Sequence, residues 1–310
     1  MPRNTVAAKK RKIRVALMAC GEFTGKLLRE NGDYLEVYSR WLKKSLSRNS
    51  KIKPEVECYK VYADDPLPID DEIDDCDVVL VSGSPSDAWA DGPPWIPRLV
   101  NFIRHVGTNF LQVRICDKGI CCGYQIVNRA LSGQVDGTRQ RPLEIGPTVI
   151  YTTDMGKILY GKEKLELQQF HQDHVPIESL GDFLMAGEAS ADYSNQGIVK
   201  FYPLDPNTDP TAEFKLHERI HILTSQGHPE FTEAIVTEIA RQREEKSTIT
   251  QKTIDDYLGD KGRTSEIKPM VTTGCGKQWA RDYNGVQVIT HAFWKMFGIE
   301  HPKDEEEDDD

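Results

Sequence analysis

The chain of 310 residues lacks the features that mark several classes of protein. It contains no run of about eighteen apolar residues, so no segment has the apolar length of a transmembrane helix. Its first residues lack the apolar stretch of a secretory signal, and no Gly-rich phosphate loop occurs along it. The seven cysteines are odd in number and are not spaced as zinc ligands, so we expect reduced thiols. We therefore expect a cytoplasmic protein with no membrane partner, no bound metal and no cofactor.

Charge is distributed unevenly along the chain. The formal net charge is −10, and the acidic run 304–310 supplies most of it. Such a block of like charges predicts a disordered acidic tail, which we place at 300–310. The basic run from Lys9 to Lys12 has two interpretations, a nuclear-import patch or the flank of a first strand. We favour the flank, because nothing else in the chain indicates nucleic-acid binding.

The first half of the chain alternates between strand-like and helix-like segments. Runs rich in apolar and β-branched residues predict strands at 13–19, 56–62, 77–81 and 110–115. Apolar residues at helical spacing predict helices at 34–46 and 95–106, and a helix-like stretch follows at 126–131. This alternation is typical of βαβ units. We therefore predict an α/β fold, an open, mostly parallel, twisted sheet with helices on both faces.

The second half of the chain contains shorter strand candidates. They lie at 147–152, 165–170, 183–188, 197–202 and 220–224, and they either extend the sheet or form a small antiparallel flap. Helices are predicted at 231–243 and 286–297, and we favour packing of the second on the sheet over a role in binding a partner. The expected organisation is a basic arm at 1–12, one main domain at 13–245, a C-terminal extension at 246–299 and the acidic tail.

One segment, 119–125, carries the strongest chemical signal. It reads Gly-Ile-Cys-Cys-Gly-Tyr-Gln, between an apolar strand candidate and a helix. This is the layout of a nucleophile elbow, a strained strand-to-helix turn beside which only glycine fits without a Cβ clash. Cys121 has a glycine two residues away on each side, whereas Cys122 does not, so Cys121 is the predicted nucleophile. The N–H groups at the start of the following helix favour its thiolate.

A cysteine nucleophile needs a base, and the base needs an orienting group. Two downstream segments contain histidine, 170–175 (Phe-His-Gln-Asp-His-Val) and 226–231 (Gln-Gly-His-Pro-Glu-Phe). In the second, a bend at Pro229 would let the carboxylate of Glu230 reach the imidazole of His228 and fix its tautomer. The other ring nitrogen would then face the thiol, so we predict His228 as the base and Glu230 as its orienting group.

Together the two motifs resemble those of the class I glutamine amidotransferases with a Cys-His-Glu triad. The resemblance covers roughly residues 13–245, and it is greatest to the stand-alone, GMP-synthase-like amidotransferase proteins of fungi and plants. Supporting matches are 82–88 (Ser-Gly-Ser-Pro-Ser-Asp-Ala), after the third strand, and 144–146 (Glu-Ile-Gly). The resemblance implies a flavodoxin-like sheet and hydrolysis of a γ-glutamyl amide through a thioester on Cys121.

The resemblance also implies roles for further residues. The oxyanion hole would use the backbone N–H of Cys122 and one from the turn at Gly83 and Ser84. The glutamyl pocket would be shaped by five residues, Gln125, His171, Gln172, Asp173 and His174. For the two histidines we favour this pocket role over a pair of metal ligands.

Three readings of the function follow. In the first, the chain is a glutaminase that releases ammonia to a separate ammonia-accepting synthase, because no nucleotide-binding motif is visible in the chain itself. In the second, the same triad cleaves γ-glutamyl peptides or glutathione conjugates. In the third, the fold is a catalytically impaired binding or regulatory module, an interpretation prompted by Tyr124 and by the polar pair at 117–118 before the elbow.

Overall fold

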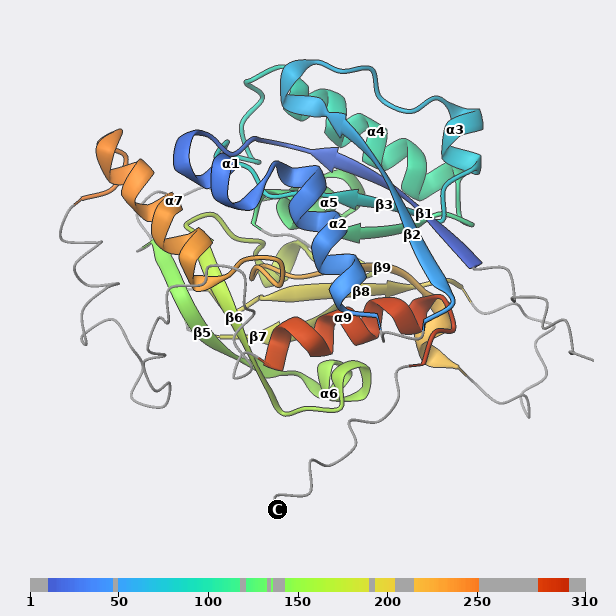
Figure 1. The fold of residues 1–310 in the computed structure, drawn as a ribbon. Helices are drawn as coiled ribbons and strands as arrows, with labels where there is room; N and C mark the ends of the chain where they lie inside the picture. Colours follow the sequence, from blue (N-terminus) through green and yellow to red (C-terminus); the bar gives the residue numbers. More distant parts are fainter. Residues whose placement is uncertain are drawn as a thin grey trace, which may run out of the picture.

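Nine strands form one mixed sheet in the computed structural model, in the order β2-β1-β3-β4-β9-β8-β7-β5-β6 (Figure 1). The structure describes residues 11–46, 50–117, 121–132, 135, 143–189, 193–203, 215–250 and 284–300. The strands are β1 (Arg11–Ala19), β2 (Ile52–Lys60), β3 (Val78–Val81), β4 (Arg114–Asp117), β5 (Glu144–Thr152), β6 (Lys164–His171), β7 (Leu184–Glu188), β8 (Gly197–Phe201) and β9 (Ile220–Thr224).

One half of the sheet is parallel and the other antiparallel. The pairs β1–β2, β1–β3, β3–β4 and β4–β9 are all parallel. Strands β8, β7, β5 and β6 continue the sheet through antiparallel pairs. The predicted α/β sheet is confirmed, and the short strands of the second half extend it.

Helices cover both faces of the sheet (Figure 1). Along β1, Ala16 and Met18 face the side covered by α4 (Trp95–Asn109) and α5 (Cys122–Leu131). The alternate residues Val15 and Leu17 face the opposite side, where α2 (Tyr34–Lys44), α6 (Asp154–Tyr160) and α9 (Asn284–Met296) pack. Strand side chains alternate between faces, so a strand buried on both sides must be apolar throughout, as β1 is over its second half.

Helix α9 packs on the sheet next to the start of the chain. Phe293 and Trp294 are fully buried, and the indole N–H of Trp294 donates to the hydroxyl of Ser45, 2.8 Å away. The guanidinium of Arg11 donates to the carbonyl of Phe297 at 2.8 Å. These contacts fasten α9 to both α2 and β1. The sequence predicts the arm at 1–12, but Arg11 and Lys12 belong to β1. Residues 1–10 of that arm, 251–283, and 301–310 of the predicted tail lie outside the described residues.

Two helices stand beside the carboxyl edge of the parallel strands, α1 (Gly25–Asn31) and α7 (Glu233–Glu245). They share a small apolar cluster that includes Leu27 and Ile235. Helix α7 begins where the sequence predicts, because the hydroxyl of Thr232 accepts a hydrogen bond from the amide of Ile235. None of the helices that the structure describes is long and apolar enough to cross a bilayer.

Candidate active site

The site lies where three neighbouring parallel strands end. Strands β3, β4 and β9 are adjacent, so their carboxyl ends meet at one edge of the sheet, where open α/β sheets bind ligands. Cys121 follows the end of β4 by four residues, and His228 follows the end of β9 by four residues. The amide of Cys121 donates to the carbonyl of Gln226 at 3.2 Å, which ties the two loops together. Residues far apart in the sequence are thereby brought to one place.

Cys121 occupies a strained turn. Its φ of 64° and ψ of −96° lie outside the regions that residues with a Cβ ordinarily adopt, and such strain costs about 1–3 kcal/mol. It is the residue that immediately precedes α5, and its side chain is partly exposed. Cys122, by contrast, is fully buried among the side chains that pack under α4 and α5. The thiol at position 121 is the one that faces a cavity.

His228 and Glu230 form a buried pair. Nδ1 of His228 lies 3.2 Å from Oε1 of Glu230, and both side chains are almost completely buried. The imidazole stacks on Phe231 with ring centroids 4.0 Å apart, and the backbone amide of His228 donates to the carbonyl of Gln168 at 2.7 Å. Nε2 of His228 is buried without a hydrogen-bond partner among the described residues. The carboxyl group of Glu230 therefore holds one ring nitrogen of His228, Nδ1, while the other, Nε2, has no partner among those residues.

A glycine is required next to this imidazole. A Cβ at Gly227 would lie 2.8 Å from Cβ of Leu167 and 2.8 Å from the side-chain nitrogen Nε2 of Gln169. The loop that carries His228 approaches β6 too closely for any side chain at this position. Gly227 therefore lets the base lie against the sheet.

Burial sets the charge of the pair. Burial, with the nearby charge of His171 as the second cause, holds the pKa of His228 well below its usual range. Burial likewise raises the pKa of Glu230 well above its usual range. The hydroxyl of Tyr38 donates to Oε1 of Glu230 at 3.4 Å and acts in the opposite direction on that carboxyl. At neutral pH the imidazole is consequently a free base, ready to accept a proton.

Cys121, His228 and Glu230 line one cavity of about 420 Å³, a size that is ordinary for a small-molecule site. Gly83 and Ser84, which follow β3, line it as well. The remaining lining residues come from the segment after β1, from α1 and α2, from the turn after β2, from the loop after β3, from β6, and from α7 with its flanks; they are Cys20, Gly21, Glu22, Phe23, Thr24, Leu27, Tyr34, Tyr38, Tyr62, Pro85, Ser86, Phe170, Phe231, Ile239, Gln242, Arg243, Lys246 and Thr248.

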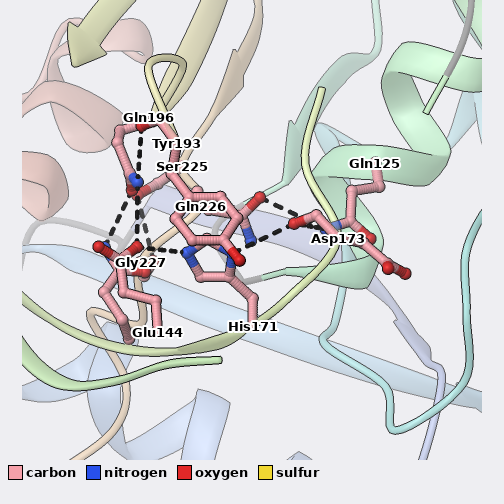
Figure 2. A network of polar contacts seen from close by, with 10 residues as sticks. Gln125, Glu144, His171, Asp173, Tyr193, Gln196, Ser225, Gln226 and Gly227 are labelled. Atoms are coloured by element: carbon pink, nitrogen blue, oxygen red, sulfur yellow. Dashed lines mark hydrogen bonds and ion pairs between the residues drawn. The ribbon is translucent and has the colours of Figure 1, made fainter. Parts of the chain in front are cut away.

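The residues expected to shape the glutamyl pocket occupy a different place. Gln125 is buried and donates through Nε2 to the carbonyl of Asp173 at 3.0 Å (Figure 2). Nδ1 of His171 lies 3.1 Å from the same carbonyl. His174 is buried, and Gln172 is partly buried. The lining of the cavity, as the structure describes it, includes none of these five residues.

Gln125, His171 and Asp173 instead belong to a polar network between α5 and the β5–β8 end of the sheet (Figure 2). Nε2 of His171 lies 2.7 Å from Oε2 of Glu144, and the same oxygen accepts from Nε2 of Gln196 at 3.3 Å. Both nitrogens of His171 thus face oxygen atoms, the carbonyl of Asp173 and the carboxyl group of Glu144.

Sequence reasoning did not identify several residues of the site. Tyr38 lies on the buried face of a helix predicted from its apolar spacing, so its pattern gives no sign that it reaches Glu230. Glu144 and Gln196 meet His171 only because β5, β6 and β8 enter one sheet. Among the described residues, no group of three or more histidine, cysteine, aspartate or glutamate side chains could hold a metal ion.

Comparisons with known proteins agree with this fold. The chain is 24% identical to a glutamine amidotransferase-like protein of Schizosaccharomyces pombe over 202 residues, which are 64% of this chain and 71% of that protein. A crystal structure of a glutamine amidotransferase from Methylobacillus flagellatus has the same fold, with a TM-score of 0.53, 18% identity, and coverage of 94% of this chain and 97% of that one. The chain thus has the fold of a glutamine amidotransferase and is similar in sequence to glutamine amidotransferase-like proteins.

One plant protein that is similar to this chain is named as a peptidase. The chain is 28% identical to γ-glutamyl peptidase 4 of Arabidopsis thaliana over 181 residues, which are 57% of this chain and 62% of that protein. No protein-family profile matches the chain. The chain therefore has similar sequence identity to proteins named for two different activities, glutamine amidotransferase and γ-glutamyl peptidase.

Proposed function

We propose that this chain hydrolyses the γ-glutamyl amide bond of a small substrate through a thioester on Cys121. One observation carries the proposal. A strained cysteine lines the same cavity as a buried imidazole whose Nδ1 is held by Glu230 and whose Nε2 has no partner among the described residues. A nucleophile, a base and an orienting carboxyl group are the parts that acyl transfer requires.

The first half of the reaction forms the thioester. Nε2 of His228 takes the proton of the Cys121 thiol while Sγ attacks the γ-carbonyl carbon. The resulting oxyanion would accept hydrogen bonds from the backbone N–H of Cys122 and from the turn at Gly83 and Ser84. As the carbon–nitrogen bond breaks, the imidazolium returns its proton to the departing nitrogen, and ammonia or an amine leaves.

The second half regenerates the enzyme. A water molecule gives its proton to Nε2 of His228 and attacks the thioester carbon. The carbon–sulfur bond then breaks, the thiol of Cys121 takes the proton back, and free glutamate leaves. Glu230 would hold one tautomer of the imidazole throughout. The network around Gln125 and His171 would hold the loop at Gln226 that precedes His228.

Two substrates share this chemistry. With glutamine, the product is ammonia, and a separate synthase would consume it. With a γ-glutamyl peptide, the product is an amino acid or a shorter peptide, which needs no acceptor. The names of the yeast and plant relatives support one substrate each. The reading as a binding module without catalysis is the competing outcome of the experiment below.

The test is release of glutamate as a function of pH. His228 acts as a base only when it is neutral, and burial places its pKa well below 6.5. We therefore expect kcat/KM for a γ-glutamyl compound to stay on its plateau as the pH falls through 6.5, and to decline only at more acidic pH, where the imidazole gains a proton. Glutamate is measured enzymatically in samples quenched at each pH.

Two results would contradict the proposal. A decline centred near 6.5, the usual histidine pKa, would show that the base is not the buried imidazole described above. An absence of glutamate release at every pH, with the protein folded, would make the binding-module reading the leading one.

A further inference from the structure

Two cations stand at the end of α7 in the wall of the cavity that contains Cys121. They are Arg243, in the last turn, and Lys246, the residue that follows the helix. Within the described part of the chain, neither makes an ion pair with a carboxylate. The lining also contains two acids, Glu230, which is held by His228, and Glu22, which accepts from the hydroxyl of Tyr62 at 2.9 Å. Neither acid forms an ion pair with Arg243 or Lys246 in the described structure, so both cations are available to an anionic group of a ligand.

The position of Arg243 is fixed by its surroundings. Its guanidinium carbon lies 5.8 Å from the ring centroid of Phe170, in a cation–π contact that also supports a planar fork. Its backbone carbonyl accepts from both the amide and the hydroxyl of Thr248, at 2.9 and 2.8 Å. The neighbouring Gln242 donates to the carbonyl of Thr24 at 3.2 Å, which ties α7 to the loop after β1. These backbone bonds hold the end of α7, and the ring of Phe170 limits the freedom of the guanidinium before it binds an anion.

Aromatic side chains connect the base with this cation. The imidazole of His228 stacks on Phe231, and Phe231 packs in the same apolar cluster as Phe23 and Phe170. Phe170 in turn contacts Arg243. The cavity thus presents a nucleophile and base, then apolar rings, then a cation. A ligand that fits this order has a polar reactive group, a short apolar or neutral body and a negative end.

The two candidate substrates differ in that negative end. The leaving group of glutamine is ammonia, which has no carboxylate. The leaving group of a γ-glutamyl peptide is an amino acid or peptide, and its carboxylate lies beyond the departing nitrogen. We infer that Arg243, assisted by Lys246, binds the carboxylate of the leaving group, so that the substrates of this chain are γ-glutamyl peptides with a free C-terminal carboxylate. This inference rests on the proposed function.

The experiment compares three substrates, γ-glutamylglycine, its C-terminal amide and free glutamine. The wild type should prefer the acid over its amide, and the substitution Arg243→Ala should remove that preference. Arg243→Ala removes a hydrogen bond between two charged groups. We therefore expect the acid-to-amide ratio of kcat/KM to fall by about tenfold to a hundredfold, mainly through a higher KM for the acid. Arg243→Lys, which keeps the charge but loses the fork, should restore part of the ratio.

The control is Arg241→Ala on the same helix. Arg241 is exposed and does not line the cavity, so this variant should keep the wild-type ratio. The ratio compares two substrates on the same protein sample, so partial unfolding of a variant cannot produce the expected result.

Other outcomes overturn the inference in distinguishable ways. If Arg243→Ala lowers kcat/KM equally for all three substrates, the arginine binds the α-carboxylate that they share, and only the leaving-group assignment fails. If the wild type does not distinguish the acid from the amide, that assignment fails as well. If the wild type releases glutamate from none of the three, the proposed function fails, and this inference fails with it.

Discussion

Replacement of Cys121 by alanine should abolish release of glutamate, while replacement of Cys122 should leave most of it. Loss of a covalent nucleophile typically lowers kcat by about ten-thousand-fold or more, because the binding groups that remain cannot form the acyl intermediate. Cys122→Ala removes one sulfur from the core under α4 and α5 and leaves the thiol at position 121 in place. The measurement is kcat and KM for both variants with one γ-glutamyl substrate.

The two variants show which of the adjacent cysteines, Cys121 or Cys122, is the nucleophile. If Cys122→Ala were inactive and Cys121→Ala active, the nucleophile would be the buried thiol, and the strained turn at position 121 would have another cause. Thermal unfolding of both variants checks that they are folded. Cys122→Ala should lower the melting temperature more than Cys121→Ala, because only its side chain is fully buried.

The second large effect is expected at His228. His228→Ala removes the base that accepts the thiol proton and later activates water, so kcat should fall by about ten-thousand-fold or more. Members of a catalytic unit are not additive: once one is missing, removing another costs little more. We therefore expect the double variant Cys121→Ala with His228→Ala to be hardly less active than either single variant. The measurement is a double-mutant cycle on kcat.

His105→Ala is the matched control for this cycle. His105 is exposed and does not line the cavity, and its Nε2 lies 2.9 Å from a carboxylate oxygen of Asp70. This variant should keep wild-type activity. If the effects of the Cys121 and His228 substitutions were instead additive, the two side chains would act independently, and the assignment of His228 as the base would be wrong.

Much of the parallel half of the fold could be predicted from the sequence. Strands that are buried on both faces have continuous apolar runs, and the segments containing β1 and β3 show them clearly. Helix α2 was visible because its apolar residues repeat at helical spacing. The short helices α1, α3 (Asp70–Asp74) and α6 were not predicted. Each spans two turns or fewer, too short for an apolar period to stand out.

The candidate site was only partly visible in the sequence. Glycine spacing singled out Cys121, and the order His-Pro-Glu singled out His228 and Glu230, because these signals are local. The roles of Tyr38 and Arg243 depend on the tertiary arrangement that brings α2 and α7 to the same strand edge. The residue pattern within α2 or α7 does not predict that these side chains reach the site. The sequence therefore indicates the reacting groups, and the fold adds the residues that surround them.

The central claim is that Cys121 is an activated nucleophile in a γ-glutamyl site. Its most direct test uses 6-diazo-5-oxo-norleucine, a glutamine analogue that alkylates an activated thiol, followed by peptide mass spectrometry of the wild type and of Cys121→Ala. The account predicts one adduct, on Cys121, which is absent from the variant and is suppressed by an excess of glutamine or of a γ-glutamyl peptide. The account would be contradicted if the folded protein formed no adduct, or if the adduct were on Cys122 or Cys116.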